Sequence, residues 1–153
     1  MEGVPWESPV EISKASDRPS MRHSHRIRLN AAWQRSELSQ SEASVWDTAQ
    51  AASSTVKLPD RGVAFCDAPM ALFERRFNSP TGLTPESTVV LDCGLFGCAD
   101  SIRFNGLVVG GPTESRLDIT ELLRPHNELL LLIKKVHFSA AAEATAELVI
   151  FTE

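Results

Sequence analysis

Several residue types and patterns are scarce or absent in this sequence of 153 residues. It contains no tyrosine and only three cysteines, and its longest apolar run is the five residues 129–133. A membrane-spanning helix needs roughly 18 consecutive apolar residues, so no membrane partner is expected. The N-terminus has no cationic start followed by an apolar stretch, and an odd number of cysteines is typical of reduced thiols. These absences predict a cytoplasmic protein without a disulfide framework.

Basic charge is also scarce, because 15 Lys and Arg stand against 20 Asp and Glu, for a net charge of −5. Phosphate contacts need a basic surface, so nucleic acid is not an expected partner. The one basic concentration runs from Arg18 to Arg28 and includes two histidines. Such a run is usually a solvated strand edge or tail, and the alternative is a docking surface for an acidic protein partner.

Signatures of cofactor and metal sites are missing as well. The sequence has no Gly-rich phosphate loop and no Asp-rich calcium loop. Four residues separate Cys93 from Cys98, whereas zinc sites usually show paired CxxC-like knuckles or a Cys/His set. No His or basic residue adjoins either cysteine to activate its thiol. The sequence therefore predicts no cofactor, no metal and no catalytic residue.

Large apolar residues are concentrated in the C-terminal part of the chain. Of the 40 Leu, Ile, Val and Phe residues, 9 lie in the first 61 positions and 31 in the remaining 92. Residues 1–20 are rich in Pro, Ser and charge, which predicts a flexible N-terminal tail. Residues 21–153 are predicted to form a single domain, with a long Ser/Ala-rich loop at about 35–55.

The periodicity within that domain is typical of a β protein. Residues 26–34 alternate in polarity and predict a first strand, while 120–124 is the only expected helical turn. The pair Asn105-Gly106 predicts a tight type I′ hairpin, and the continuous apolar run at 129–136 predicts a central strand covered on both faces. Short apolar runs between Pro, Gly and Asn predict strands at 71–78, 87–93, 101–104, 107–109, 129–136 and 147–151.

The order of these motifs resembles a known family. The segments IRLNAAW, LFERRF, LDCGLFGCADSIRFNGLVVGG and RLDITELLRPHNELLLLI, within 27–33 and 71–133, are similar to the N-terminal jelly-roll of family 2 glycoside hydrolases. This is the galactose-binding-domain-like, sugar-binding domain of those enzymes. The resemblance implies an all-β fold, a jelly-roll β-sandwich. It also implies that the catalytic carboxylates belong to a separate (β/α)₈ barrel, so we expect this chain not to be an enzyme.

Three polar residues within the matched segments are predicted to be structural rather than to bind a ligand. Asn105 belongs to the hairpin turn, Asp118 caps the turn that follows it, and Asn127 ties a loop to the sheet.

Arg75 is the first candidate ligand-binding residue, because the alternation in LFERRF places it on the same face as Phe73 and Phe77. A buried guanidinium needs a partner. One interpretation is a structural ion pair or an arginine bonded to a backbone carbonyl. The other places Arg75 on the floor of an open cleft, where it donates hydrogen bonds to sugar hydroxyls or to a carboxylate.

Trp46 is the second candidate, because sugar sites stack an apolar ring face on an aromatic side chain. Trp46 lies in the predicted long loop and is either such a platform or an anchor that pins the loop to the sandwich. Together with the resemblance, these residues predict a non-catalytic carbohydrate-binding-like module. The alternative is a protein-protein interaction module with no sugar ligand.

Overall fold

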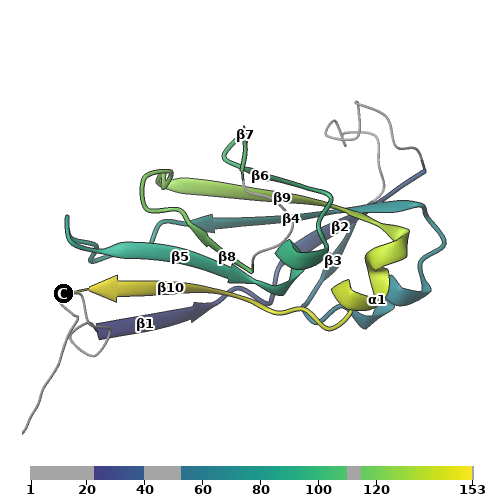
Figure 1. The fold of residues 1–153 in the computed structure, drawn as a ribbon, viewed down its shortest axis with the longest axis horizontal. Coiled ribbons are helices and arrows are strands. Elements are labelled where there is room, and N and C mark those ends of the chain that lie inside the picture. Colours follow the sequence, from purple (N-terminus) through teal and green to yellow (C-terminus); the bar gives the residue numbers. More distant parts are fainter. Residues whose placement is uncertain (1–22, 40–52, 110–114, 153) are drawn as a thin grey trace, which may run out of the picture.

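The computed structural model describes residues 23–39, 53–109 and 115–152, which form two stacked sheets (Figure 1). The four-stranded sheet contains, in spatial order, β1 (His23–Arg28), β10 (Ala146–Thr152), β5 (Thr88–Cys93) and β8 (Arg116–Asp118). The six-stranded sheet contains β3 (Ser53–Val56), β2 (Trp33–Leu38), β4 (Met70–Asn78), β9 (His126–Lys134), β6 (Ser101–Phe104) and β7 (Leu107–Val108). All of these strand pairs are antiparallel, so the predicted β-sandwich is confirmed.

The core between the sheets is built from inward-facing apolar side chains of both layers. The rings of Trp33 and Phe73 meet edge to face with centroids 6.4 Å apart, and Phe77 stacks on Phe104 at 6.1 Å. Trp33, Phe73 and Phe104 are completely buried. Aromatic pairs at these separations add to the free energy gained from burial alone.

Strand β9 is the central strand that the apolar run at 129–136 predicts, although it begins at His126 and ends at Lys134, before a short helical turn at 135–137. It lies between β4 and β6, and its residues Leu129, Leu131 and Ile133 face the main core. The intervening side chains face the opposite side of the sheet. A second buried cluster there consists of Leu38, Met70, Leu72 and Leu132. The run is continuous in sequence because both faces of the strand are covered.

The prediction of one strand at 26–34 is wrong, because this segment forms two strands in different sheets. The chain leaves β1 and crosses to β2 at Ala32, whose backbone φ is +65°. The crossing is held by Asn30, whose side-chain oxygen accepts a hydrogen bond from the backbone N–H of Ala146 at 2.8 Å. Ile27 and Trp33 both contact the core, as the alternation suggested, but from opposite layers.

Both ends of the loop expected at about 35–55 are β-strands in the structure. Residues 35–38 belong to β2 and residues 53–55 to β3, and these two strands pair with each other. Residues 40–52 lie outside the described residues. The polar sequence of β2 hides the strand, because only Trp33, Ser36 and Leu38 in it are buried.

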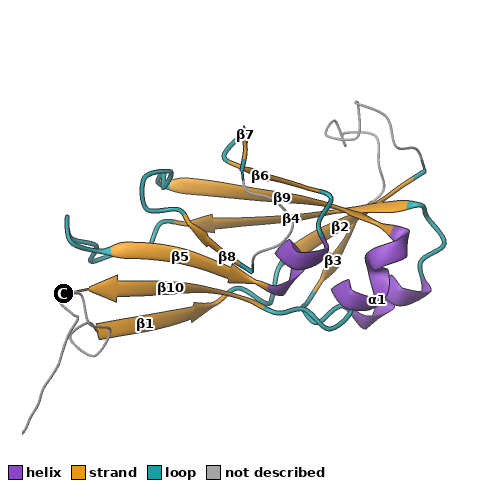
Figure 2. Cartoon of the chain, viewed as in Figure 1, coloured by secondary structure: helices purple, strands orange, loops and turns teal. Residues whose placement is uncertain are grey.

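Short helices gather toward one end of the sandwich, where sequence periodicity predicts none (Figure 2). They are η3 (Arg61–Phe65), η4 (Gly94–Cys98), η5 (Lys135–His137) and α1 (Phe138–Ala141), and each of the first three contacts α1. With three to five residues each, they are too short for a 3.6-residue period to be visible. At the predicted helical turn 120–124 the chain instead forms a hydrogen-bonded turn, with the N–H of Leu122 donating to the carbonyl of Ile119 at 2.9 Å.

No helix within the described ranges is long and apolar enough to cross a membrane.

Candidate functional site

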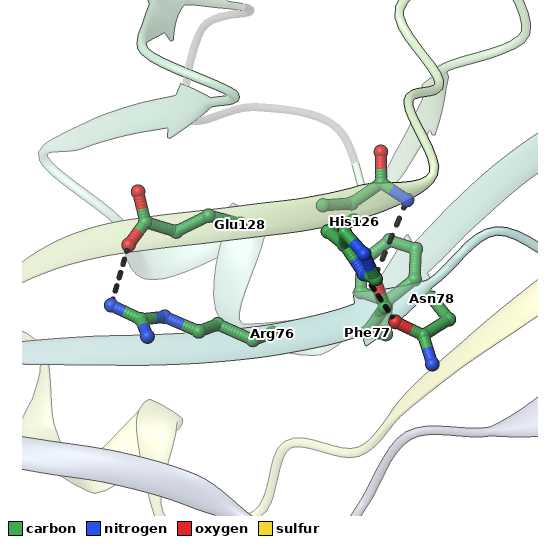
Figure 3. Close-up of a pocket in the computed structure, with 6 residues that line it drawn as sticks. Arg76, Phe77, Asn78, His126 and Glu128 are labelled. Carbon is green, nitrogen blue, oxygen red and sulfur yellow. Dashed lines mark hydrogen bonds and ion pairs between the residues drawn. The ribbon is translucent and has the colours of Figure 1, made fainter.

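The outer face of the six-stranded sheet is hollowed where β4 ends and β9 begins (Figure 3). One hollow of about 470 Å³ is lined by Arg76, Phe77, Asn78, His126, Asn127 and Glu128. A second hollow of about 390 Å³ is lined by Ala32, Gln34, Glu74 and Arg76. The two hollows share Arg76, and together they are called the β4–β9 groove. Each has a volume typical of pockets for small ligands.

Strand register brings the charged side chains of the groove together. Arg76 of β4 lies opposite Glu128 of β9, and Glu74 of β4 lies opposite Gln34 of β2. Directly opposed residues in an antiparallel pair project from the same face and lie within side-chain contact. Glu74 and Arg76 are two positions apart, so both point away from the core, on the opposite face from Phe73 and Phe77.

The guanidinium of Arg76 joins two carboxylates on the groove surface. Its Nε donates to Glu74 at 2.8 Å and its Nη2 donates to Glu128 at 3.3 Å. The side chain of Arg76 is 75% exposed, whereas that of Glu74 is 23% exposed. Burial of Glu74 and its hydrogen bond with Glu128 raise the pKa of Glu74 above its ordinary value. The adjacent Glu74 carboxylate in turn raises the pKa of Arg76.

Further polar side chains complete the groove on either side of this charged centre. His126 Nδ1 and Asn78 Oδ1 are hydrogen-bonded at 2.8 Å across the end of the β4–β9 pair (Figure 3). Gln34 donates through Nε2 to the hydroxyl of Thr55 at 2.8 Å. The bond to Thr55 uses one N–H of Gln34 Nε2, and the bond to His126 uses the oxygen of Asn78. The other N–H of Gln34 and the Nδ2 group of Asn78 can therefore donate to a ligand.

Arg75 lies on the core-facing side of β4, opposite Leu129, and lines neither hollow of the β4–β9 groove. Its Nη1 donates to the backbone carbonyl of Arg76, and its Nε is buried without a hydrogen-bond partner. Within the described ranges no carboxylate forms an ion pair with Arg75. Burial lowers the pKa of Arg75. Of the two structural alternatives, the carbonyl-bonded arginine describes the contact that this residue makes.

The structure describes only some of the other residues that were predicted to bind a ligand or partner. Trp46 lies outside the described residues, as do Arg18 and Arg22 of the basic segment. Within that segment, Arg26 and Arg28 belong to β1, an edge strand of the four-stranded sheet, and Arg26 forms an ion pair with Glu147.

The three polar residues predicted to be structural all make hydrogen bonds within the fold. Asn105 takes φ +51° and Gly106 φ +85°, the left-handed pair that a type I′ hairpin requires. The Asp118 carboxylate accepts a hydrogen bond from the backbone N–H of Thr120 at 3.0 Å. Asn105 also donates through Nδ2 to the side-chain oxygen of Asn127 at 3.0 Å.

Asn127 links the hairpin, the following loop and β4. Its oxygen accepts from the backbone N–H of Arg124 at 2.9 Å, in addition to the bond from Asn105. Its Nδ2 donates to the carbonyls of Arg124 at 2.9 Å and of Phe77 at 3.3 Å. This buried amide therefore forms part of the wall of the groove without offering a free atom to a ligand.

All three cysteines are buried and unpaired, as the sequence predicts. Burial raises the pKa of Cys93 to about 12 and also raises the pKa of Cys66 and of Cys98. Such thiols are protonated at neutral pH and are poor nucleophiles. Among the described residues, no group of three or more His, Cys, Asp or Glu side chains could hold a metal ion.

Sequence reasoning missed the charged residues at the centre of the groove. The alternation in LFERRF already places Glu74 and Arg76 on one face, opposite the aromatic residues. The alternation does not show that Glu128 lies beside Arg76, because the two residues are 52 positions apart and meet only through the register of β4 with β9.

Comparison with solved structures shows where this architecture occurs. An FMN-binding β-glucuronidase from Faecalibacterium prausnitzii L2-6 matches with a TM-score of 0.56 and 20% identity, over 83% of this chain. A β-glucuronidase from Ruminococcus gnavus gives a TM-score of 0.57 and 15% identity over 85% of this chain. Another from F. prausnitzii gives 0.58 and 14% over 84%. The chain shares its fold with one part of these β-glucuronidases.

The shared fold accounts for a minor part of each β-glucuronidase, because the chain spans only 22%, 28% and 31% of their respective lengths. The part that matches is the β-sandwich. The resemblance to family 2 glycoside hydrolases is thus confirmed at the level of the fold. No protein-family model matches this sequence, and no curated protein matches it either.

Proposed function

We propose that this chain is a non-catalytic carbohydrate-binding module whose sugar site is the β4–β9 groove. The observation that carries the proposal is the exposed guanidinium of Arg76, held by Glu74 and Glu128 on the outer face of a sandwich of the β-glucuronidase type. Planar groups with fixed donors and acceptors suit the paired hydroxyls of a sugar ring. Because the site lies on paired strands, its side chains are held in place before a ligand binds.

The composition of the groove favours weak binding. Phe77 is the one aromatic residue among its lining side chains, and Phe77 is only 9% exposed because its ring packs into the core. A sugar in this site would gain hydrogen bonds but little stacking energy. We therefore expect dissociation constants in the millimolar range for single sugars.

The arrangement of the two glutamates does not favour hydrolysis. Glycosidases place two carboxyl groups about 5 to 9.5 Å apart on either side of the scissile bond. Here Glu74 and Glu128 both bind the guanidinium of Arg76, which occupies the space between them where a scissile bond would have to lie. This supports the proposal that the module does not catalyse the reaction of the enzymes that share its fold.

The test is a titration of the isotope-labelled protein with neutral hexoses, followed by backbone amide shifts. We expect saturable shifts at Glu74, Arg76 and Glu128, and their loss in Arg76→Ala. Arg26→Ala is the matched control, because Arg26 is an exposed, ion-paired arginine on the other sheet. The absence of saturable binding at millimolar sugar, or equal losses in both variants, would contradict the proposal.

A second candidate function, a protein-protein interaction module, is favoured by two exposed apolar side chains. Phe65 of η3 is 85% exposed and Val136 of η5 is 78% exposed, and both of these elements contact α1. Isolated exposed residues are common, but a phenylalanine this exposed favours contact with another protein. A partner that is lost in Phe65→Ser and is indifferent to sugars would support this function over the first.

The basic segment Arg18 to Arg28 remains a proposed contact for an acidic protein, and binding through it would weaken at high salt. We place the protein in the cytoplasm, a location in keeping with three unpaired, buried cysteines.

A further inference from the structure

We infer that the β4–β9 groove selects neutral sugars over sugars that carry a carboxylate, an inference that rests on the proposed function. The charged side chains that line the groove are one guanidinium and two carboxylates. The guanidinium of Arg76 is already bound to both Glu74 and Glu128. A carboxylate on the ligand would therefore meet a cation whose charge is balanced and two anions beside it.

The hydrogen-bonding atoms left at the centre of the groove suit hydroxyl groups. Arg76 uses Nε and Nη2 for its two glutamates, so the N–H groups of Nη1 can donate to a ligand oxygen. Glu74 and Glu128 each bind Arg76 through Oε2. Their remaining lone pairs can accept from a hydroxyl, which is both a donor and an acceptor. A carboxylate can only accept, so it cannot satisfy these oxygens.

Among the described residues that line the groove, no lysine and no second arginine offsets the charge of the two glutamates. On the outer face β2 contributes Gln34, β4 contributes Asn78, and β9 contributes Leu130 and His126. Of these, His126 is hydrogen-bonded to Asn78 at the end of the groove away from Glu74. On β6, Arg103 lies opposite Leu130 and lines neither hollow.

The selection should depend on pH. Glu74 binds a proton at a higher pH than an ordinary glutamate, because it is partly buried and is hydrogen-bonded to Glu128. Once Glu74 is ionised, its negative charge beside Glu128 repels an anionic ligand most strongly. As pH falls through the raised pKa of Glu74, the groove gains a proton and this repulsion decreases. A uronic acid remains ionised over that interval, so its affinity should increase while that of a neutral sugar changes little.

The experiment compares methyl β-D-glucoside with methyl β-D-glucuronide, which differ only at C6, and the corresponding galactosides. Amide shifts of the full chain are titrated with each sugar at about pH 7.5 and about pH 5. We expect each uronide to bind about tenfold more weakly than its neutral partner at the higher pH, and the difference to narrow at the lower pH. Glu128→Gln should reduce the difference in affinity between uronide and neutral sugar at both pH values. Glu147→Gln, which replaces an ion-paired glutamate of the other sheet, should leave this difference unchanged.

The outcomes separate this inference from the proposed function. Neutral binding with weaker uronide binding, relieved by Glu128→Gln, supports both. Equal or tighter binding of the uronide at about pH 7.5 overturns the selectivity and leaves the sugar site in place. If neither sugar shifts the groove amides in a protein whose spectrum is that of a folded chain, the proposed function and this inference both fail.

Discussion

Asn127 is only 2% exposed, and both the oxygen and the nitrogen of its side-chain amide are hydrogen-bonded within the protein. In Asn127→Ala the N–H of Arg124 and the carbonyls of Arg124 and Phe77 lose their side-chain partner in a site with little access for water. We expect the free energy of unfolding to fall by about 3 kcal/mol. Chemical denaturation measures the loss, with Asn78→Ala as an exposed control. A loss equal to that of the control would contradict the role assigned to Asn127.

Arg75 allows the effects of packing and charge to be separated. Its stem lies on the core face of β4 with Phe73 and Phe77, while its buried Nε has no partner. Arg75→Ala removes the packed stem and should lower the free energy of unfolding by about 1 to 3 kcal/mol. Arg75→Met keeps most of the volume and removes an uncompensated charge, so it should cost less than Arg75→Ala or increase stability.

Thermal and chemical unfolding measure the stability of both Arg75 variants, and sugar titrations measure their binding. If both variants are fully stable and only sugar binding is lost, Arg75 lines a ligand cleft, as the alternative interpretation of the sequence holds. If Arg75→Met is as unstable as Arg75→Ala, the hydrogen bond to the Arg76 carbonyl carries the stability instead.

At the scale of an element, the β6–β7 hairpin depends on backbone that few side chains tolerate. Gly106 has φ +85° and no atom within 4 Å of the position a Cβ would take. Gly106→Ala therefore costs conformational strain alone, about 1 kcal/mol. Gly97→Ala is the matched control, since its site is equally open and its φ is not left-handed. Equal stabilities of the two variants, measured by denaturation, would show that the hairpin adapts to a different turn.

Elements were predictable from the sequence where a local signal was strong. The Asn105-Gly106 turn and the apolar β9 each depend on neighbouring residues, and both are where the sequence predicts them. The segment 26–34 misled because apolar residues continue at every second position through Ala31 to Trp33, although the chain changes sheets between Arg28 and Trp33. A crossing of that kind depends on tertiary contacts such as the bond from Ala146 to Asn30, which no local pattern records.

At the scale of the whole molecule, the candidate site was less predictable than the fold. The sandwich is predicted by many short apolar segments, so an error in the prediction of one strand does not change the predicted fold class. The groove depends on a single register, which sets Arg76 beside Glu128. A shift of one residue would turn Arg76 inward and bring Arg75 to the surface. Sequence reasoning selected Arg75, the inward-facing arginine of β4, whereas Arg76 of the same strand lines the groove.

The three buried thiols test whether the sandwich opens as one unit. Cys93 lies at the end of β5, Cys98 in η4 and Cys66 just after η3, and none is more than 7% exposed. In native protein we expect an aromatic disulfide reagent to label all three slowly and at one rate, that of global unfolding. Denatured protein, in which all three thiols react at once, is the control. Faster labelling of Cys66 alone, isolated with the Cys66→Ser variant, would show that the η3–α1 end opens independently of the sheets.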